Sequence, residues 1–202
     1  MLITGIKTTP LLVRNKVPYH WAHWVIYGTE VILVEVQTND GISGYGECIG
    51  TPSSAGVRSF IDLAAQHLMG QSVFLSRQAM AQCYHALFQA HGTCSAPRFG
   101  GQVLAGLEMA MWDAAGKTAG CAVHELLGGK VRDEIEYFGF IQGETADELA
   151  SDAAQLVQEG HRVIYGNLDV GNSWTLRLSA RFGLQSVNRF VFDSILMRPG
   201  IH

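Results

Sequence analysis

The sequence predicts an α+β domain followed by the beginning of a parallel α/β structure. Two observations support this prediction. Residues up to about 50 show strand patterns and residues 53–120 show helical periods, so strands and helices are segregated along the first part of the chain. After Gly129 the order changes to strand, helix and strand, which is the arrangement of a βαβ unit.

Three N-terminal strands are expected to form an antiparallel sheet. The first, ITGIKTTPLLVRN, alternates loosely between apolar and polar residues. The second contains VILVEV (31–36), which is apolar on both faces until Glu35 and therefore predicts a largely buried strand. Asn39-Asp40-Gly41 then predicts a tight hairpin, because Asp and Gly tolerate positive φ. The return strand is GISGYGECIG.

Three helices are expected after the sheet. Ser53 or Ser54 can cap the first and Ser76 the second, while the third runs from about 102 to 118 and ends at Gly120. The segment HGTCSAPRFGG between the second and third helices is expected to be a loop. A 3.6-residue period predicts the buried faces: Val57, Phe60, Ile61, Ala64 and Leu68; Ala79, Met80, Cys83, Tyr84, Leu87 and Phe88; Val103, Leu107, Ala110, Met111, Ala114 and Ala115.

The βαβ unit follows in residues 130–165. EIEYFGFI predicts a short strand and HRVIY a second one. Between them, GETADELASDAAQLVQEG predicts an amphipathic helix with Thr145 as N-cap and Glu148 completing a capping box. Residues 166–202 lose clear periodicity and carry four arginines after Gly171 but no lysine. The predicted boundaries are therefore 1–129, 130–165 and an atypical tail of 166–202.

The composition limits the classes of function. The 202 residues are 48% hydrophobic and 16% charged, with a net charge of −4, so no nucleic-acid or anionic-membrane partner is expected. No apolar stretch is long enough for a membrane span, and MLITGIKTTP does not resemble a signal peptide, so a cytoplasmic location is expected. The four cysteines lack a CxxC pair, which favours reduced, buried thiols over a zinc site: Cys48, Cys83, Cys94 and Cys121.

Two short motifs are candidate sites. GYGECIG fails the GxGxxG spacing, so its glycines are interpreted as letting a strand bend or another backbone approach, and Glu47 alone is a weak candidate. YHWAHW (19–24) is placed in the loop between two strands. His20 and His23 lack a third metal ligand, so a substrate-contacting aromatic loop is favoured over a metal site. Asp113 and Lys117 fit an ordinary i,i+4 ion pair on the third helix.

The segment LAGLEMAMWDAAGKTAGCAVHELLGG closely resembles the signature of the mandelate racemase and muconate lactonising enzyme family, in the enolase superfamily. The pattern is E-x-A-x-W-D-x-x-G-K, a small-residue turn and V-x-x-L-L-G-G. DGISGYGEC resembles the family's hairpin, GHRVIY resembles its approach to the second barrel strand, and the resemblance covers about residues 1–165. The residues that carry it are Gly41, Gly44, Gly46, Glu47, Glu108, Ala110, Trp112, Asp113, Gly116, Lys117, Val123, Leu126, Leu127, Gly128 and Gly129.

The resemblance implies an N-terminal capping domain, with a three-stranded antiparallel sheet and a helical bundle, and the incomplete start of a TIM-like (β/α) barrel. In this family the barrel holds Mg²⁺ on three carboxylates and basic residues remove a proton α to a carboxylate. The products arise by racemisation, cycloisomerisation or dehydration of acid sugars. For the intact parent, the resemblance therefore implies Mg²⁺ and a small carboxylate substrate such as an acid sugar. A homo-oligomer of the parent is a further expectation, because relatives are often multimeric.

The chain departs from the family pattern after Tyr165. The family has Y-x-K-x-G there, and its lysine is commonly a catalytic base, whereas here Gly166-Asn167-Leu168-Asp169 follows. No later Asp-x-Asn metal motif is present. The chain is therefore expected to lack catalytic residues and metal ligands, and to bind no Mg²⁺.

The tail permits a frameshift hypothesis. When each codon is read from the third base of the one written, suitable synonymous choices turn FDSILMRPGIH into R-F-D-P-N-E-A-W-D-P. That segment resembles the family's first metal ligand. The same shift turns GNLDVGN into K-L-G-R-G-E. The hypothesis places a frameshift near Tyr165 and Gly166, with residues 166–202 translated out of frame.

Three interpretations follow. The favoured one is an N-terminal fragment of a family enzyme that is catalytically incomplete as written. The second is a stand-alone binding or regulatory module that reuses the capping fold. The third is a different enzyme that uses His20, His23 and Glu47. Under the first interpretation, the cap loops contribute specificity, and the residues predicted to contact substrate are Tyr19, His20, Trp21, Trp24 and Thr51.

Overall fold

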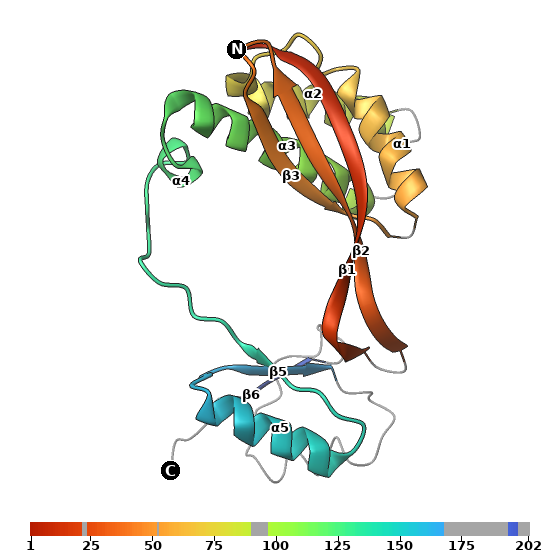
Figure 1. Ribbon diagram of the computed structural model, residues 1–202, viewed down its shortest axis with the longest axis vertical. Coiled ribbons are helices and arrows are strands. Elements are labelled where there is room, and N and C mark those ends of the chain that lie inside the picture. Colours follow the sequence, from red (N-terminus) through yellow and green to blue (C-terminus); the bar gives the residue numbers. More distant parts are fainter. Residues whose placement is uncertain (22–23, 52, 90–96, 168–193, 198–202) are drawn as a thin grey trace. The chain divides into compact units, whose positions relative to one another are not determined.

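The computed structural model describes residues 1–21, 24–51, 53–89, 97–167 and 194–197 (Figure 1). The chain divides into two compact units. The first contains Met1–Arg14 and Gly28–Val131, and the second contains Asn15–Tyr27 and Arg132–His202. The outer part of the first hairpin, 15–27, therefore belongs to the second unit.

The first unit contains the expected three-stranded antiparallel sheet, in the order β1-β2-β3, which confirms that prediction. In the hairpin between β2 and β3, the Thr38 N–H donates to the Ile42 carbonyl at 3.0 Å, and Gly41 has a φ of 82°. The hairpin predicted at Asn39-Asp40-Gly41 is therefore confirmed. The strands are β1 (Ile3–Trp21), β2 (Trp24–Thr38) and β3 (Ser43–Ile49).

The helices cover one face of the sheet. Ile32, Val34 and Val36 are fully buried, and Figure 1 shows the helices on a single face of this sheet. Val31, Leu33 and Glu35 point to the other face, where Val31 is buried and the other two are half-buried. The prediction of a largely buried strand at 31–36 is therefore confirmed. Hydrogen bonds from the side chains of Gln37 and Ser43 hold the pKa of Glu35 below its usual value.

The helices follow the expected order with corrected boundaries. Ser53 caps the first helix by accepting from the Gly56 N–H at 3.4 Å, as predicted. Ser76 is not an N-cap: it has helical φ and ψ and is the first residue of its helix, while Ser72 caps the preceding 3₁₀ turn. The elements are α1 (Ser54–Ala65), η1 (Val73–Leu75), α2 (Ser76–Gln89), α3 (Pro97–Ala119) and α4 (Val123–Leu126).

Helix α3 is longer than expected. It begins at Pro97, so the end of the segment interpreted as a loop is helical. Proline is compatible with a first helical position, because the amide proton that it lacks would have no partner inside the helix. The predicted end is confirmed, because Gly120 follows the helix with a φ of 67°.

The predicted apolar faces form one core beneath the sheet. Phe60 and Tyr84 are exceptions, because they are 36% and 50% exposed. The side chains of Leu87 and Phe88 lie outside the described residues. The predicted helical positions found in the core are Val57, Ile61, Ala64, Leu68, Ala79, Met80, Cys83, Val103, Leu107, Ala110, Met111, Ala114 and Ala115.

Glycines allow α3 to lie directly against β3. A β-carbon at Gly44 or Gly46 would overlap the α3 backbone, and one at Gly106 would overlap the Cys48 sulfur. We call these three residues the glycine seam. The interpretation that the GYGECIG glycines allow another backbone to approach is therefore confirmed. This close approach lets α3 pack along β3 (Figure 1).

The second unit contains the expected βαβ arrangement. It comprises β4 (Gly139–Phe140), α5 (Ala146–Gln158) and β5 (Ile164–Asn167). The strands β4 and β5 are parallel, with Phe140 opposite Tyr165. The predicted capping box is confirmed, because Thr145 and Glu148 each accept a backbone N–H from the other.

One further strand was not expected. In the tail, β6 (Ser194–Met197) pairs antiparallel with β5, with Leu196 opposite Tyr165. Its residues, SILM, are mainly apolar and suit a strand. Neighbouring strands of a (β/α) barrel are parallel, so β6 does not continue a barrel pattern.

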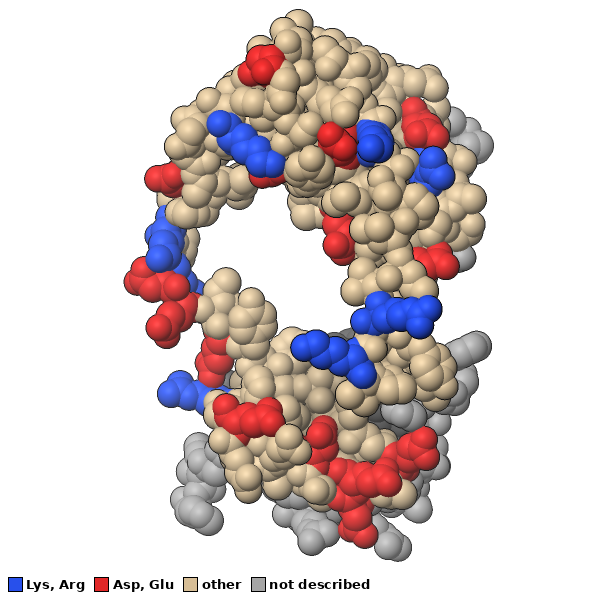
Figure 2. All heavy atoms as spheres, in the orientation of Figure 1, with Lys and Arg blue, Asp and Glu red and all other residues tan. Residues whose placement is uncertain are grey.

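The face of the molecule in Figure 2 carries no broad basic surface. Lys and Arg are dispersed there, whereas acidic side chains gather over α5. The exposed residues Glu144, Asp147 and Glu148 lie at the N-terminal end of that helix, where its dipole favours negative charge. Among the described residues, no helix is long and apolar enough to cross a membrane.

Three cysteines lie in the described residues as free thiols. Cys48 and Cys83 are buried, and Cys121 is half-buried. Burial raises the pKa of Cys48 and of Cys83 from 9.0 to about 11. Cys94 lies outside the described residues. The prediction of buried thiols therefore holds for Cys48 and Cys83 but not for Cys121.

We expect Cys48 and Cys83 to react slowly with iodoacetamide in the folded chain. A pKa raised by this amount lowers the thiolate fraction at pH 8 by about 100-fold, before burial restricts access. Each buried thiol stabilises the folded chain while it is neutral. This stabilisation is complete below pH 9 and is lost as the pH rises from 9 to about 11. Mass spectrometry should locate early label outside these two residues, and rapid labelling of either one would contradict the buried core.

Candidate functional site at the hairpin tip and strand ends

The predicted aromatic loop is mostly strand. β1 continues through Trp21 and β2 begins at Trp24, so placing all of YHWAHW in a loop is wrong. Aromatic and β-branched residues on both sides favour extended backbone, and the Asn15 side chain donates to the Ile26 carbonyl across the hairpin at 2.9 Å. The side chains of His20, Trp21 and Trp24, and the whole of His23, lie outside the described residues.

Tyr19 belongs to an aromatic cluster in the second unit. Its ring centroid lies 5.0 Å from that of Phe140. The Phe140 ring lies 5.2 Å from Tyr165, and the Phe138 ring lies 5.5 Å from Tyr165. All three pairs are tilted, within the range of favourable aromatic contacts. We call Tyr19, Phe138, Phe140 and Tyr165 the aromatic cluster.

The cluster lies on the sheet face opposite α5. Gly139 faces this helix, because a β-carbon there would lie 3.0 Å from Leu156. Side chains alternate along a strand, so Phe138 and Phe140, and Tyr165 opposite Phe140, point to the other face. In a (β/α) barrel the face away from the helices is the interior, and active sites lie at the carboxyl ends of the strands. The aromatic cluster therefore occupies the face on which a barrel builds its active site.

Position 167 is the last residue of β5, two residues after Tyr165. It is the position of the lysine in the Y-x-K-x-G pattern, but here it is Asn167, whose neutral amide is not a base. Among the residues that the structure describes, no three His, Cys, Asp or Glu side chains form a group that could hold a metal ion. The described residues therefore do not fit the three-carboxylate set that Mg²⁺ requires in this chemistry.

Thr51 lies in the first unit, where it is exposed between β3 and α1. Glu47 is exposed on β3, as expected from the alternation of that strand. The prediction that Thr51 contacts substrate stays a prediction.

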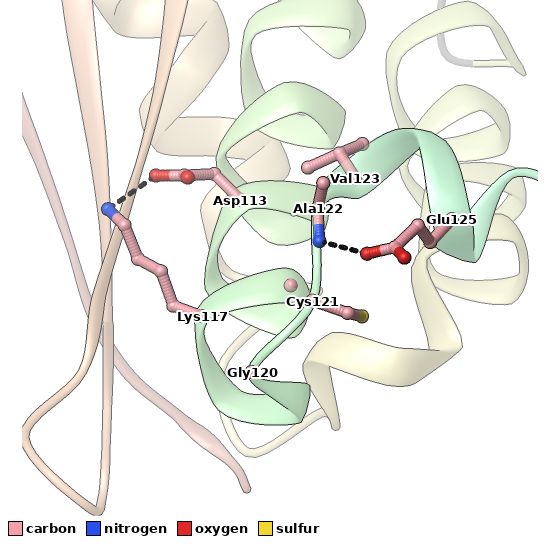
Figure 3. A pocket seen from close by; sticks show the side chains of 8 residues that line it. Asp113, Lys117, Gly120, Cys121, Ala122, Val123 and Glu125 are labelled. Carbon is pink, nitrogen blue, oxygen red and sulfur yellow. Dashed lines mark hydrogen bonds and ion pairs between the residues drawn. The ribbon is translucent and has the colours of Figure 1, made fainter. Parts of the chain in front are cut away.

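Asp113 and Lys117, two charged residues of the signature in α3, bind this helix to β3. Asp113 accepts from Lys117 at 2.7 Å, which confirms the predicted ion pair (Figure 3), and from the Tyr45 N–H at 2.8 Å. Lys117 also donates to the Ser43 carbonyl at 2.9 Å and lies 4.7 Å from the centre of the Tyr45 ring. These contacts give the signature a structural role in the first unit.

A hollow of about 360 Å³ lies where α3 turns into α4 (Figure 3). Its polar groups bind one another: Asp113 pairs with Lys117, and Glu125 accepts from the Ala122 N–H at 2.8 Å. Gly116 leaves room for the turn, because a β-carbon there would lie 2.9 Å from the Cys121 carbonyl. The hollow is therefore explained by the turn itself.

Sequence reasoning missed Phe138, Phe140 and Tyr165 as candidate site residues. The available signal was the alternation in EYFGFI, which places two phenylalanines two positions apart on one strand face. Nothing in that local pattern indicates that Tyr19, from a distant segment, packs against them.

The first unit has the architecture of an enolase-type N-terminal capping domain, and the second unit contains a parallel βαβ arrangement. The family described as "Mandelate racemase / muconate lactonizing enzyme, N-terminal domain" matches residues 3–128. The chain belongs to this family. The expected resemblance is thereby confirmed.

Similar proteins include a D-galactonate dehydratase family member from Streptomyces sp., 29% identical over 80% of this chain and 36% of the relative. A D-galactarolactone cycloisomerase from Agrobacterium fabrum is 28% identical over 78% of this chain and 41% of the relative. A solved enolase structure from Thermobispora bispora, in complex with magnesium and formate, is 28% identical with a TM-score of 0.65, covering 81% of this chain and 44% of its own. The chain thus spans about two fifths of the length of these relatives.

Proposed function

We propose that this chain supplies the capping domain and first βα unit of an enzyme that removes a proton α to a carboxylate. The substrate of the parent enzyme would be a small carboxylate such as an acid sugar. Family membership and the sugar-acid relatives support this proposal. The observation that carries it is the aromatic cluster, in which Tyr19 of the hairpin packs on the face where a barrel builds its active site.

In this proposal the chain contributes specificity rather than chemistry. Tyr19, His20, Trp21 and Trp24 of the hairpin, and Thr51 of the first unit, contact the substrate. Mg²⁺ in the parent would stabilise the enediolate formed when the proton is removed. The described residues do not fit that metal, so the proposal assigns this chain neither a metal ligand nor a catalytic base.

The proposal also holds that residues 166–202 are translated out of frame. Asn167 in place of the family's lysine supports this, as does a tail strand that pairs antiparallel where a barrel would continue in parallel. The shifted codons that restore K-L-G-R-G-E and R-F-D-P-N-E-A-W-D-P support it further.

Sequencing the gene tests both parts of the proposal. The region runs through the codons for 165–202 and about 600 further bases, the coding length of the rest of a typical barrel. We expect a single-base change to restore the lysine and first metal-ligand motifs. The repaired protein should then convert acid sugars only with Mg²⁺. A confirmed frame, with no family-like sequence in any frame beyond it, would exclude the frameshift, and an inactive repaired protein would refute the substrate class.

A further inference from the structure

Glu30 of β2 contacts both ends of the connection between β3 and α1. Its backbone carbonyl accepts from the Gly50 N–H at 2.7 Å. Its carboxylate accepts from the Ser54 hydroxyl at 2.6 Å. Thr51 lies between these two anchored residues, and residue 52 lies outside the described residues.

The first of these two contacts, between Gly50 and the Glu30 carbonyl, leaves no space for a side chain at position 50. Gly50 is buried, and a β-carbon there would lie 2.9 Å from the Glu30 carbonyl oxygen and 2.8 Å from the Ser54 hydroxyl. The Gly50 backbone therefore rests directly on Glu30, and any larger residue would push the connection away from β2.

The second anchor fixes the start of α1. Ser54 is the first residue of this helix, and Ser53 caps it. A carboxylate beside a helix N-terminus is also favoured by the helix dipole. The Glu30 side chain thus links β2 to Ser54, where the connection ends and α1 begins.

We propose that Glu30 is a positioning residue that holds Thr51 in a fixed place for substrate. The contact of Thr51 with substrate rests on the proposed function. The restraint on the connection between β3 and α1 rests only on the contacts of Glu30. Removing the carboxylate would release the Ser54 end and leave the backbone anchor at Gly50.

Hydrogen exchange of the full 202-residue chain, followed by mass spectrometry, tests this restraint. We expect Glu30→Ala to speed exchange of the Gly56 and Val57 amides, which donate to Ser53 at the start of α1, by about three- to tenfold, the effect of one lost hydrogen bond of ordinary strength. Exchange in α3 should not change. Glu30→Gln keeps an acceptor oxygen and should restore slow exchange.

Two further variants make the test specific. Ser54→Ala should reproduce the effect of Glu30→Ala, and combining the two should add nothing, because both remove the same hydrogen bond. Glu47→Ala, at an exposed glutamate on the neighbouring strand, should have no effect. Unchanged exchange in Glu30→Ala, equal acceleration throughout α3, or failure of Glu30→Gln to restore slow exchange would overturn the proposal. Because no substrate is present, failure of the proposed function would leave these results unaffected.

Discussion

Replacing Gly106 with alanine is expected to lower the free energy of unfolding by about 2–3 kcal/mol, at the upper end of the usual cost of overpacking. The added β-carbon would overlap the Cys48 sulfur and lie 3.0 Å from the Glu47 carbonyl oxygen. Both neighbours belong to β3, which packs along α3, so relief requires the helix and the sheet to separate. Urea unfolding of the full chain, followed by far-UV circular dichroism, would measure the loss.

A matched control lies in the same helix. A β-carbon at Gly101 would meet nothing within 4 Å, so Gly101→Ala is expected to raise the free energy of unfolding by about 0.5–1 kcal/mol through helix propensity alone. The same substitution should thus have opposite signs at two positions of α3. Equal effects at both positions would mean that the glycine seam is not packed as described.

A double-mutant cycle identifies the neighbour responsible. Cys48→Ala removes the sulfur that the new methyl group would overlap. In that background, Gly106→Ala should cost about 1 kcal/mol less than in the unchanged chain, because residues in contact couple by this order. The Glu47 carbonyl oxygen remains close, so the relief should be partial.

The glycine seam shows what local pattern can predict. Gly44 and Gly46 alternate on one face of a strand, and the absence of a GxGxxG spacing left close backbone approach as the favoured interpretation. The caps Ser53 and Thr145 were predictable from local sequence, since each accepts from an amide three residues away. The caps depend on neighbours in sequence, and the sequence therefore predicts them well. The glycine spacing predicts that another backbone approaches the strand, but not that this backbone is α3.

The candidate site was less predictable because its contacts are not local. Tyr19 was predicted as a substrate-contacting residue, but its packing on Phe140 depends on how the hairpin meets a strand far along the chain. Placing Phe140 beside Tyr165 requires the register of two parallel strands, which no short pattern fixes. The antiparallel pairing of β6 with β5 has the same origin.

The burial of α3 beneath the sheet gives the second large prediction. Met111 is fully buried in the core, whereas Met109, two positions earlier on the same helix, is 46% exposed. Met111→Ala is expected to lower the free energy of unfolding by about 2–4 kcal/mol, because a closely packed core only partly closes around the cavity.

Met109→Ala removes the same atoms from a surface position and should change the free energy of unfolding by less than about 1 kcal/mol. Urea unfolding of both variants would measure this difference. An unchanged m value, the slope of the unfolding free energy against urea concentration, would show that the difference arises in the native state. The comparison tests which face of the family signature helix packs on the sheet. Similar losses in both variants would mean that α3 is rotated from the orientation that the glycine seam requires, since a rotation exposing Met111 would also turn Gly106 away from β3.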